Sequence, residues 1–154
     1  MSWSAVLPAL FGAVIGALVT LLADRARWRR DVAFRSHQAR RDAYTAYLAA
    51  LHTGSEGVRA VVLGEDAAAS RTQDAAEAFR SAGVYQARES LALLAPQAVA
   101  DEAGRALHRL RDLRNLAADG HPAHSPEYRT ALTRYDQSLT TLRTAMRRDI
   151  ESER

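Results

Sequence analysis

The hydrophobic and polar positions of the chain follow two patterns, and the change between them falls at Asp24. No charged side chain precedes Asp24, and residues 5–23 form a run that is mostly apolar. As a helix that rises about 1.5 Å per residue, this run is about 28 Å long, close to the ~30 Å hydrocarbon core of a bilayer. It also lacks the polar stripe that a surface helix of a globular protein carries. We therefore predict a transmembrane anchor over residues 1–23.

Aromatic and basic side chains flank the predicted anchor. Trp3 and Trp28 are separated by about 37 Å along a helix, against ~40–45 Å for a bilayer with its headgroup layers, where indole rings prefer to lie. Arginines beside a span stay on its cytoplasmic side. The predicted membrane-interface residues are therefore Trp3, Trp28, Arg25, Arg27, Arg29 and Arg30.

These flanks also predict the topology. A cleaved export signal would begin with basic side chains and end in a small-x-small site, and the sequence shows neither feature. We therefore expect a single-pass protein that is retained in the cell membrane. Its N-terminus should lie outside, and residues 24–154 should lie in the cytoplasm.

Small residues recur one helical turn apart within the predicted anchor. This small-xxx-small spacing lets two membrane helices approach closely, although small residues are common in membrane helices generally. The predicted helix-dimer face consists of Gly12, Gly16, Ala9 and Ala13. A homodimer is thus one candidate assembly.

Beyond Asp24, apolar residues recur every three or four positions in four segments, at 24–63, 70–95, 97–118 and 125–152. This spacing predicts amphipathic helices. It is most regular in the third segment, at Val99, Ala103, Leu107, Leu110, Leu113 and Ala117. In the last segment the expected buried residues are Tyr128, Leu132, Tyr135, Leu139, Leu142, Met146 and Ile150.

Together these segments predict an all-α fold. The transmembrane helix continues into a long helix, and three further helices pack against it. Because the connections are short, we expect an antiparallel up-and-down bundle. Its predicted extent is the cytoplasmic part of the chain, residues 24–154.

Glycines and helix caps mark the expected interruptions. Gly54 and Gly57 each weaken a helix by about 1 kcal/mol relative to alanine. They therefore mark the place where the first helix, predicted to continue to residue 63, would bend or break. The apolar stripe changes phase near Gly83, which predicts a kink in the second helix. Ser70 and Ser125 are typical N-cap residues and predict helix starts.

Composition and charge narrow the candidate functions. The chain has 154 residues and no cysteine, which excludes disulfides, cysteine-ligated zinc and a thiolate nucleophile. Every basic residue is arginine, and the net charge is +3. The positive excess lies in residues 24–42, with seven arginines against three aspartates, and the remainder is nearly neutral. A basic juxtamembrane helix favours binding to anionic lipid. A nucleic-acid partner would be indicated by a basic face with interleaved aromatic residues, and the sequence shows no such face.

The histidines offer little metal chemistry. His121 and His124 lie close together in sequence, but zinc sites need three or four protein ligands and no third ligand is evident. His52 and His108 stand beside apolar positions of their helices, so we expect them to be partly buried and hydrogen-bonded. The metal and cofactor predictions are therefore both "none".

No catalytic motif is present either. The sequence contains no G-x-S-x-G, P-loop or dinucleotide-binding pattern. Tyr44 and Tyr47 are the aromatic pair of greatest interest, because tyrosine hydroxyls need partners when they are buried. We predict no catalytic residue and no enzymatic activity.

Four stretches, "RARWRR", "RRDAYTAYLAAL", "AFRSAGVYQARESLALLAP" and "SPEYRTALTRYDQSLTTLRTAMR", follow a short N-out span. In this layout the chain resembles the uncharacterised single-pass membrane-anchored helical proteins of high-GC Gram-positive bacteria. The resemblance implies an anchor with a helical bundle and implies no activity.

The leading hypothesis is a non-enzymatic, membrane-tethered protein-interaction module. Its partners would be the lipid bilayer, a protein that the sequence does not identify, and a second copy of the chain. An alternative is a holin-like or toxin-like membrane-active protein built from oligomers of the span. Binding of nucleic acid or anionic lipid through the basic juxtamembrane helix ranks below both.

Overall fold

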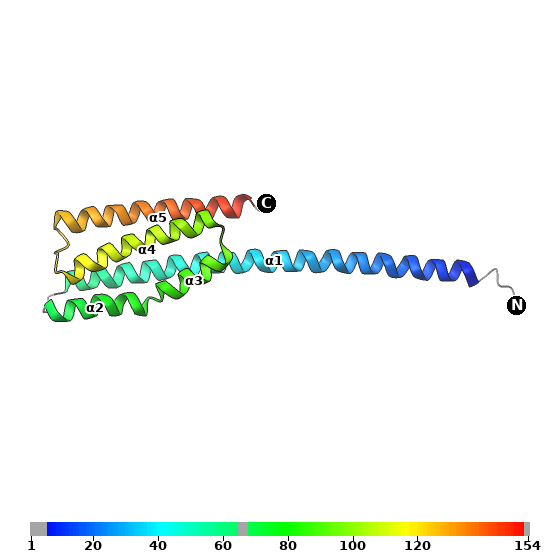
Figure 1. Cartoon of the computed structure of the whole chain (residues 1–154), viewed down its shortest axis with the longest axis horizontal. Helices are drawn as coiled ribbons and strands as arrows, with labels where there is room; N and C mark the ends of the chain where they lie inside the picture. The colour runs from blue at the N-terminus through cyan, green and yellow to red at the C-terminus, as the bar shows by residue number, and fades with distance from the viewer. Residues whose placement is uncertain (1–5, 65–67, 153–154) are drawn as a thin grey trace. The chain divides into compact units, whose positions relative to one another are not determined.

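The protein is described from a computed structural model, which covers the backbone of residues 6–64 and 68–152 and the side chains of residues 35–64 and 70–152 (Figure 1). Within these ranges the chain forms helices and short connections, with no strand. The helices are α1 (Val6–Leu63), α2 (Ala68–Ser81), α3 (Val84–Leu94), α4 (Gln97–Ala118) and α5 (Pro126–Ser152). The predicted all-helical class is confirmed.

The helix boundaries agree with the apolar pattern in part. The bounds of α4 coincide with the expected range 97–118, and α1 continues without interruption to Leu63. The predicted single helix over residues 70–95 is wrong, because α2 and α3 are separate helices. Gly83 lies between them with a φ of 64°. This left-handed conformation cannot continue a right-handed helix, and glycine adopts it without steric cost.

The chain divides into two compact units, residues 1–39 and residues 40–154. In the first unit the backbone is helical from Val6. The predicted interface residues Trp3, Trp28, Arg25, Arg27, Arg29 and Arg30, and the predicted dimer face Gly12, Gly16, Ala9 and Ala13, lie outside the residues with described side chains. A search limited to the described residues found no helix whose length and apolar content would suit a bilayer crossing.

The second unit is a helical bundle with one apolar core. Helix α4 lies beside α2, α3 and α5 (Figure 1). All six residues of the regular apolar stripe of α4 are buried. Every helix contributes to the core, whose largest fully buried side chains include Tyr47, Leu51, Phe79, Leu91, Leu110, Leu113 and Leu142.

The two glycines of α1 allow close packing within this bundle. A Cβ added to Gly57 would lie 2.7 Å from the Cβ of Ala78 on α2, and one added to Gly54 would lie 3.3 Å from a side-chain carbon of Leu110 on α4. These glycines therefore do not break the helix. They bring its backbone close to two neighbouring helices.

The start of α5 matches its expected cap, whereas the start of α2 does not. The backbone N–H of Tyr128 donates to the Ser125 hydroxyl oxygen at 3.2 Å, and Pro126 is the first helical residue. Helix α2 already begins at Ala68, so Ser70 lies inside the helix. Its hydroxyl instead donates to the Asp74 carboxylate at 2.5 Å.

Candidate functional site

Two buried tyrosine hydroxyls join α1 to α4 and α5. The Tyr47 hydroxyl donates to the backbone carbonyl of Ala103 on α4 at 2.7 Å. From α5, the Tyr135 hydroxyl donates to the carbonyl of Leu51 at 3.1 Å. Burial raises the pKa of Tyr47 and raises that of Tyr135 to about 12. Both hydroxyls therefore stay protonated donors further into the alkaline range than an exposed tyrosine.

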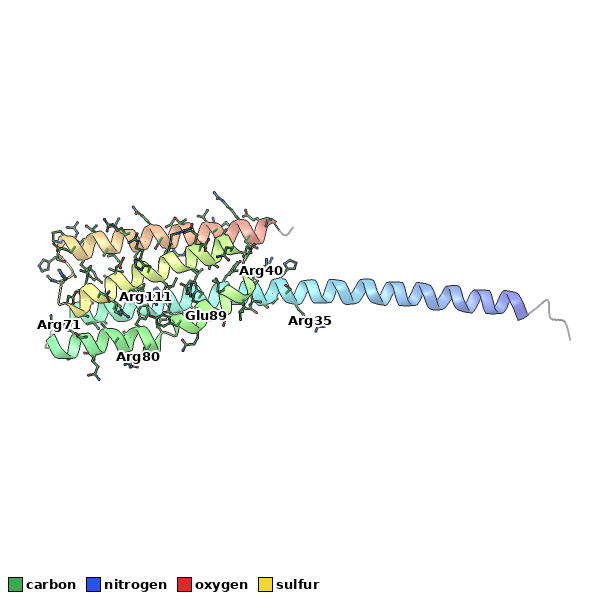
Figure 2. The ribbon with its side chains drawn as sticks, in the orientation of Figure 1. Arg35, Arg40, Arg71, Arg80, Glu89 and Arg111 are labelled. Carbon is green, nitrogen blue, oxygen red and sulfur yellow. The ribbon has the colours of Figure 1, made fainter. Side chains whose placement is uncertain are left out.

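Tyr44 makes a separate contact near the end of α5. Its hydroxyl donates to the Asp149 carboxylate at 2.7 Å, and Arg40 lies 3.5 Å from the same oxygen. Figure 2 shows Arg40 on α1, at the end of the bundle where α5 terminates. Tyr44 and Tyr47 thus have the partners that the sequence analysis required. They point to different helices, and together they do not form a ligand site.

These contacts hold α1 and α5 antiparallel, with an open groove between them. Two adjoining hollows of about 530 Å³ and 480 Å³ make up the groove, and Arg143 lines both. Residues 41–63 of α1 supply one wall, about 33 Å long at the usual helical rise. Residues 128–151 of α5 supply the other wall. We call this feature the α1–α5 groove.

Apolar side chains are exposed or half-buried along the groove. Leu132 was expected in the core but is 39% exposed, and Leu63 is 64% exposed at the end of α1. Leu48, Leu139 and Ile150 are half-buried against the core. Leu132 lies at the edge of the apolar stripe of α5, where the groove opens, so the neighbouring helix does not cover it.

The charges of the groove differ between its two ends. One hollow is lined by Arg41, Arg143 and Arg147, with Glu151 as its single carboxylate. We call these three arginines the basic end. The other hollow carries a mixed set of charged residues, Glu56, Arg59, Asp136 and Arg143.

An aromatic cluster on the other side of the bundle has a structural role. The rings of Phe79 and Tyr85 lie 5.4 Å apart, and the guanidinium carbons of Arg114 and Arg111 lie 5.1 Å from the centres of these two rings, respectively. Arg111 on α4, labelled in Figure 2, also donates to the Tyr85 hydroxyl at 3.1 Å. These contacts hold the junction of α2 and α3 against α4. Sequence reasoning missed them because the two rings are brought together by the turn at Gly83.

Of the histidines, His52 lines the α1–α5 groove, and two histidines differ from expectation. His52 and His108 are exposed, since they stand just outside the buried stripes of their helices. His108 approaches Asp112 at 3.9 Å, and His121 approaches Glu127 at 3.9 Å. Among the described residues, no group of three or more His, Cys, Asp or Glu is arranged to hold a metal ion.

Comparisons of the chain with protein-family models, with curated proteins and with solved structures found no match. The similarity to membrane-anchored proteins of high-GC Gram-positive bacteria therefore stays a prediction. The function of the α1–α5 groove has to be argued from its own residues.

Proposed function

We propose that the protein is a membrane-tethered interaction module that binds another protein through the α1–α5 groove. The observation that carries the proposal is an uncovered channel between two helices of a packed bundle, with apolar side chains exposed along it. Such a channel suits the helix-in-groove mode, in which a partner helix buries its apolar face between two helices.

The arrangement of the groove residues supports this mode. On α1 the lining residues recur at helical spacing, at Arg41, Tyr44, Leu48, His52, Ser55, Arg59 and Leu63. Residues 128–151 of α5 line the opposite wall of the groove. A partner helix of about six turns would therefore contact one continuous surface. Leu63 and Leu132, two of the exposed large apolar side chains of the described residues, would supply apolar contacts to this helix.

The tether is proposed from the sequence of residues 1–23. Its test is fractionation of the full-length protein from its native cells. We expect the protein to sediment with membranes, to resist extraction with alkali and high salt, and to be released by detergent. A protein that stays in the supernatant after ultracentrifugation would overturn the tether.

The groove is tested by site-specific photocrosslinking in the full-length protein. A photoreactive residue replaces Leu132 or Leu63 in the groove, and Leu93 serves as the control. Leu93 is 86% exposed on α3 and lies outside the groove. We expect a discrete protein adduct from the two groove positions and none from Leu93. No adduct from either groove position, or equal labelling from all three, contradicts the proposal.

A further inference from the structure

The basic end of the α1–α5 groove concentrates positive charge around an apolar floor. Arg41 extends from α1, and Arg143 and Arg147 extend from α5 on the opposite wall. All three are exposed. The floor between them consists of Tyr44, Leu48, Met146 and Ile150.

These arginines differ from those of the second arginine-rich hollow, which lies between α3 and α4. There each arginine already has a carboxylate partner: Arg88 with Glu89 at 3.1 Å, Arg109 with Asp112 at 3.2 Å, and Arg105 with Glu102. By contrast, no described carboxylate lies within 4.0 Å of Arg41, Arg143 or Arg147. The positive charge of the basic end is thus not neutralised by ion pairs with the described side chains.

The spacing of two arginines on α5 also favours a bound anion. Arg143 and Arg147 are four residues apart and lie on the same side of the helix, where like charges repel and destabilise it. An anion bound between them would remove this repulsion. Planar guanidinium groups are well suited to bind carboxylates through paired, charge-assisted hydrogen bonds.

The occupant must also match the rest of the groove. Beyond Arg143 the groove continues past Leu139 and Leu132 to Leu63. A small anion would occupy the basic end and leave these apolar side chains uncovered. An amphipathic helix fits both parts, because it can carry carboxylates at one end and an apolar stripe along the remainder.

We propose that the groove binds an acidic amphipathic helix of another protein, with a cluster of carboxylates against Arg41, Arg143 and Arg147. The apolar face of this helix lies against Leu48, Leu139 and Leu132. The inference rests on the proposed function, since it names the chemistry of the partner that the groove binds. Opposite charges accelerate association and exclude basic helices.

The experiment uses the full-length protein in its native cells, with the photocrosslinker at Leu132. Three otherwise identical proteins are compared: the unmodified arginine set, R143E/R147E, and the control R129E/R134E. Arg129 and Arg134 are exposed on the same helix, and neither lines the groove. We expect the adduct to decrease at least tenfold in R143E/R147E and to change less than twofold in R129E/R134E.

The adduct is then mapped by mass spectrometry. The crosslinked segment should have helical periodicity and contain clustered Asp or Glu. Replacing those acids with arginine in the partner should restore crosslinking to R143E/R147E. The variant R143Q/R147Q, which removes the charge without reversing it, should give an intermediate loss of crosslinking. No variant should have a lower thermal unfolding midpoint than the parent protein.

Other outcomes overturn the inference in different ways. An adduct that survives R143E/R147E, or a segment without clustered acids, contradicts the acidic helix while leaving the protein-binding groove intact. Crosslinks to lipid or to a second copy of the chain identify a different occupant. No protein adduct at all refutes the proposed function itself.

Discussion

At the scale of single residues, Gly57 shows how packing opposes helix propensity. Alanine is favoured over glycine in a helix by about 1 kcal/mol. Its Cβ would nevertheless lie 2.7 Å from the Cβ of Ala78, so α1 and α2 would have to separate. Overpacking of this kind costs about 1–3 kcal/mol. We expect Gly57→Ala to lower the free energy of unfolding by about 1 kcal/mol, measured by thermal unfolding of the full-length protein in mild detergent.

Gly104→Ala is the matched control for this prediction. Gly104 is also an interior helical glycine, on α4, but an added Cβ would meet only the end of the flexible Arg88 side chain at 3.9 Å. The same substitution should therefore stabilise the protein by about 0.5–1 kcal/mol. Equal effects of the two substitutions would show that the close approach at Gly57 has no energetic consequence.

The buried hydroxyl of Tyr135 predicts a dependence of stability on alkaline pH. Burial raises its pKa from 10.0 to about 12, so the folded state keeps its proton when the unfolded chain has lost it. This contribution to stability is complete below pH 10.0 and decreases as the pH rises toward about 12. Within that window the free energy of unfolding falls by up to about 1.4 kcal/mol per pH unit.

Tyr135→Phe separates this effect from other alkaline titrations. The variant also loses the hydrogen bond to the Leu51 carbonyl, which costs about 1 kcal/mol at neutral pH. Urea unfolding measured from pH 8 to pH 11 should then show a smaller decrease in stability above pH 10 than the parent protein shows. Parallel curves for the two proteins would mean that Tyr135 titrates normally in the folded state.

At the scale of helices, the apolar pattern predicts positions that are surrounded on all sides better than positions at an edge. The stripe of α4 is buried throughout because α2, α3 and α5 all pack against that helix. Leu132 follows the same periodicity on α5 but lies where the groove opens. Periodicity identifies the apolar face of a helix, but it does not indicate whether a neighbour covers that face along its full width.

The division between α2 and α3 is the helix-scale feature with the clearest test. The sequence predicted a kink near Gly83, and the structure shows two helices with Gly83 at a φ of 64° between them. An L-residue with a Cβ pays about 1–2 kcal/mol for this left-handed conformation. We expect Gly83→Ala to destabilise the protein by about 1 kcal/mol in a urea titration. Gly83→Asn should cost less, because asparagine tolerates the left-handed region.

An increase in stability on Gly83→Ala would contradict the separation of α2 and α3. If α2 and α3 formed one continuous helix, Gly83→Ala would increase stability and helical content, as it does in an ordinary helix interior. Far-ultraviolet circular dichroism and the unfolding midpoint, measured on the same samples, distinguish the two outcomes. A steric clash cannot account for a loss of stability, because a Cβ at Gly83 meets no neighbouring atom closer than 3.7 Å.

At the scale of the whole molecule, the candidate site depends on residues that are far apart in the sequence. Arg41 and Arg143 each lie on the polar side of an amphipathic helix, where arginine is unremarkable. Only the antiparallel pairing of α1 with α5 brings them to opposite walls of one hollow. The sequence therefore predicted the helices and most of the core, whereas the groove required knowledge of which helices are neighbours.

The distribution of charge along the molecule predicts the orientation of the proposed anchor. Residues 24–42 carry seven arginines and three aspartates, so if residues 1–23 span a membrane as proposed, the positive-inside rule predicts that this excess faces the cytoplasm. We expect replacement of Arg25, Arg27, Arg29 and Arg30 with glutamine to give a mixed population, with the C-terminus of some molecules outside the cell. A C-terminal fusion to a phosphatase that is active only outside the cytoplasm measures that fraction.

Replacement of Arg80, Arg129, Arg134 and Arg148 with glutamine removes the same charge from the bundle and should leave every C-terminus inside, because only arginines close to a span orient it. Outward phosphatase activity from the parent protein would show that the arginines do not set the topology.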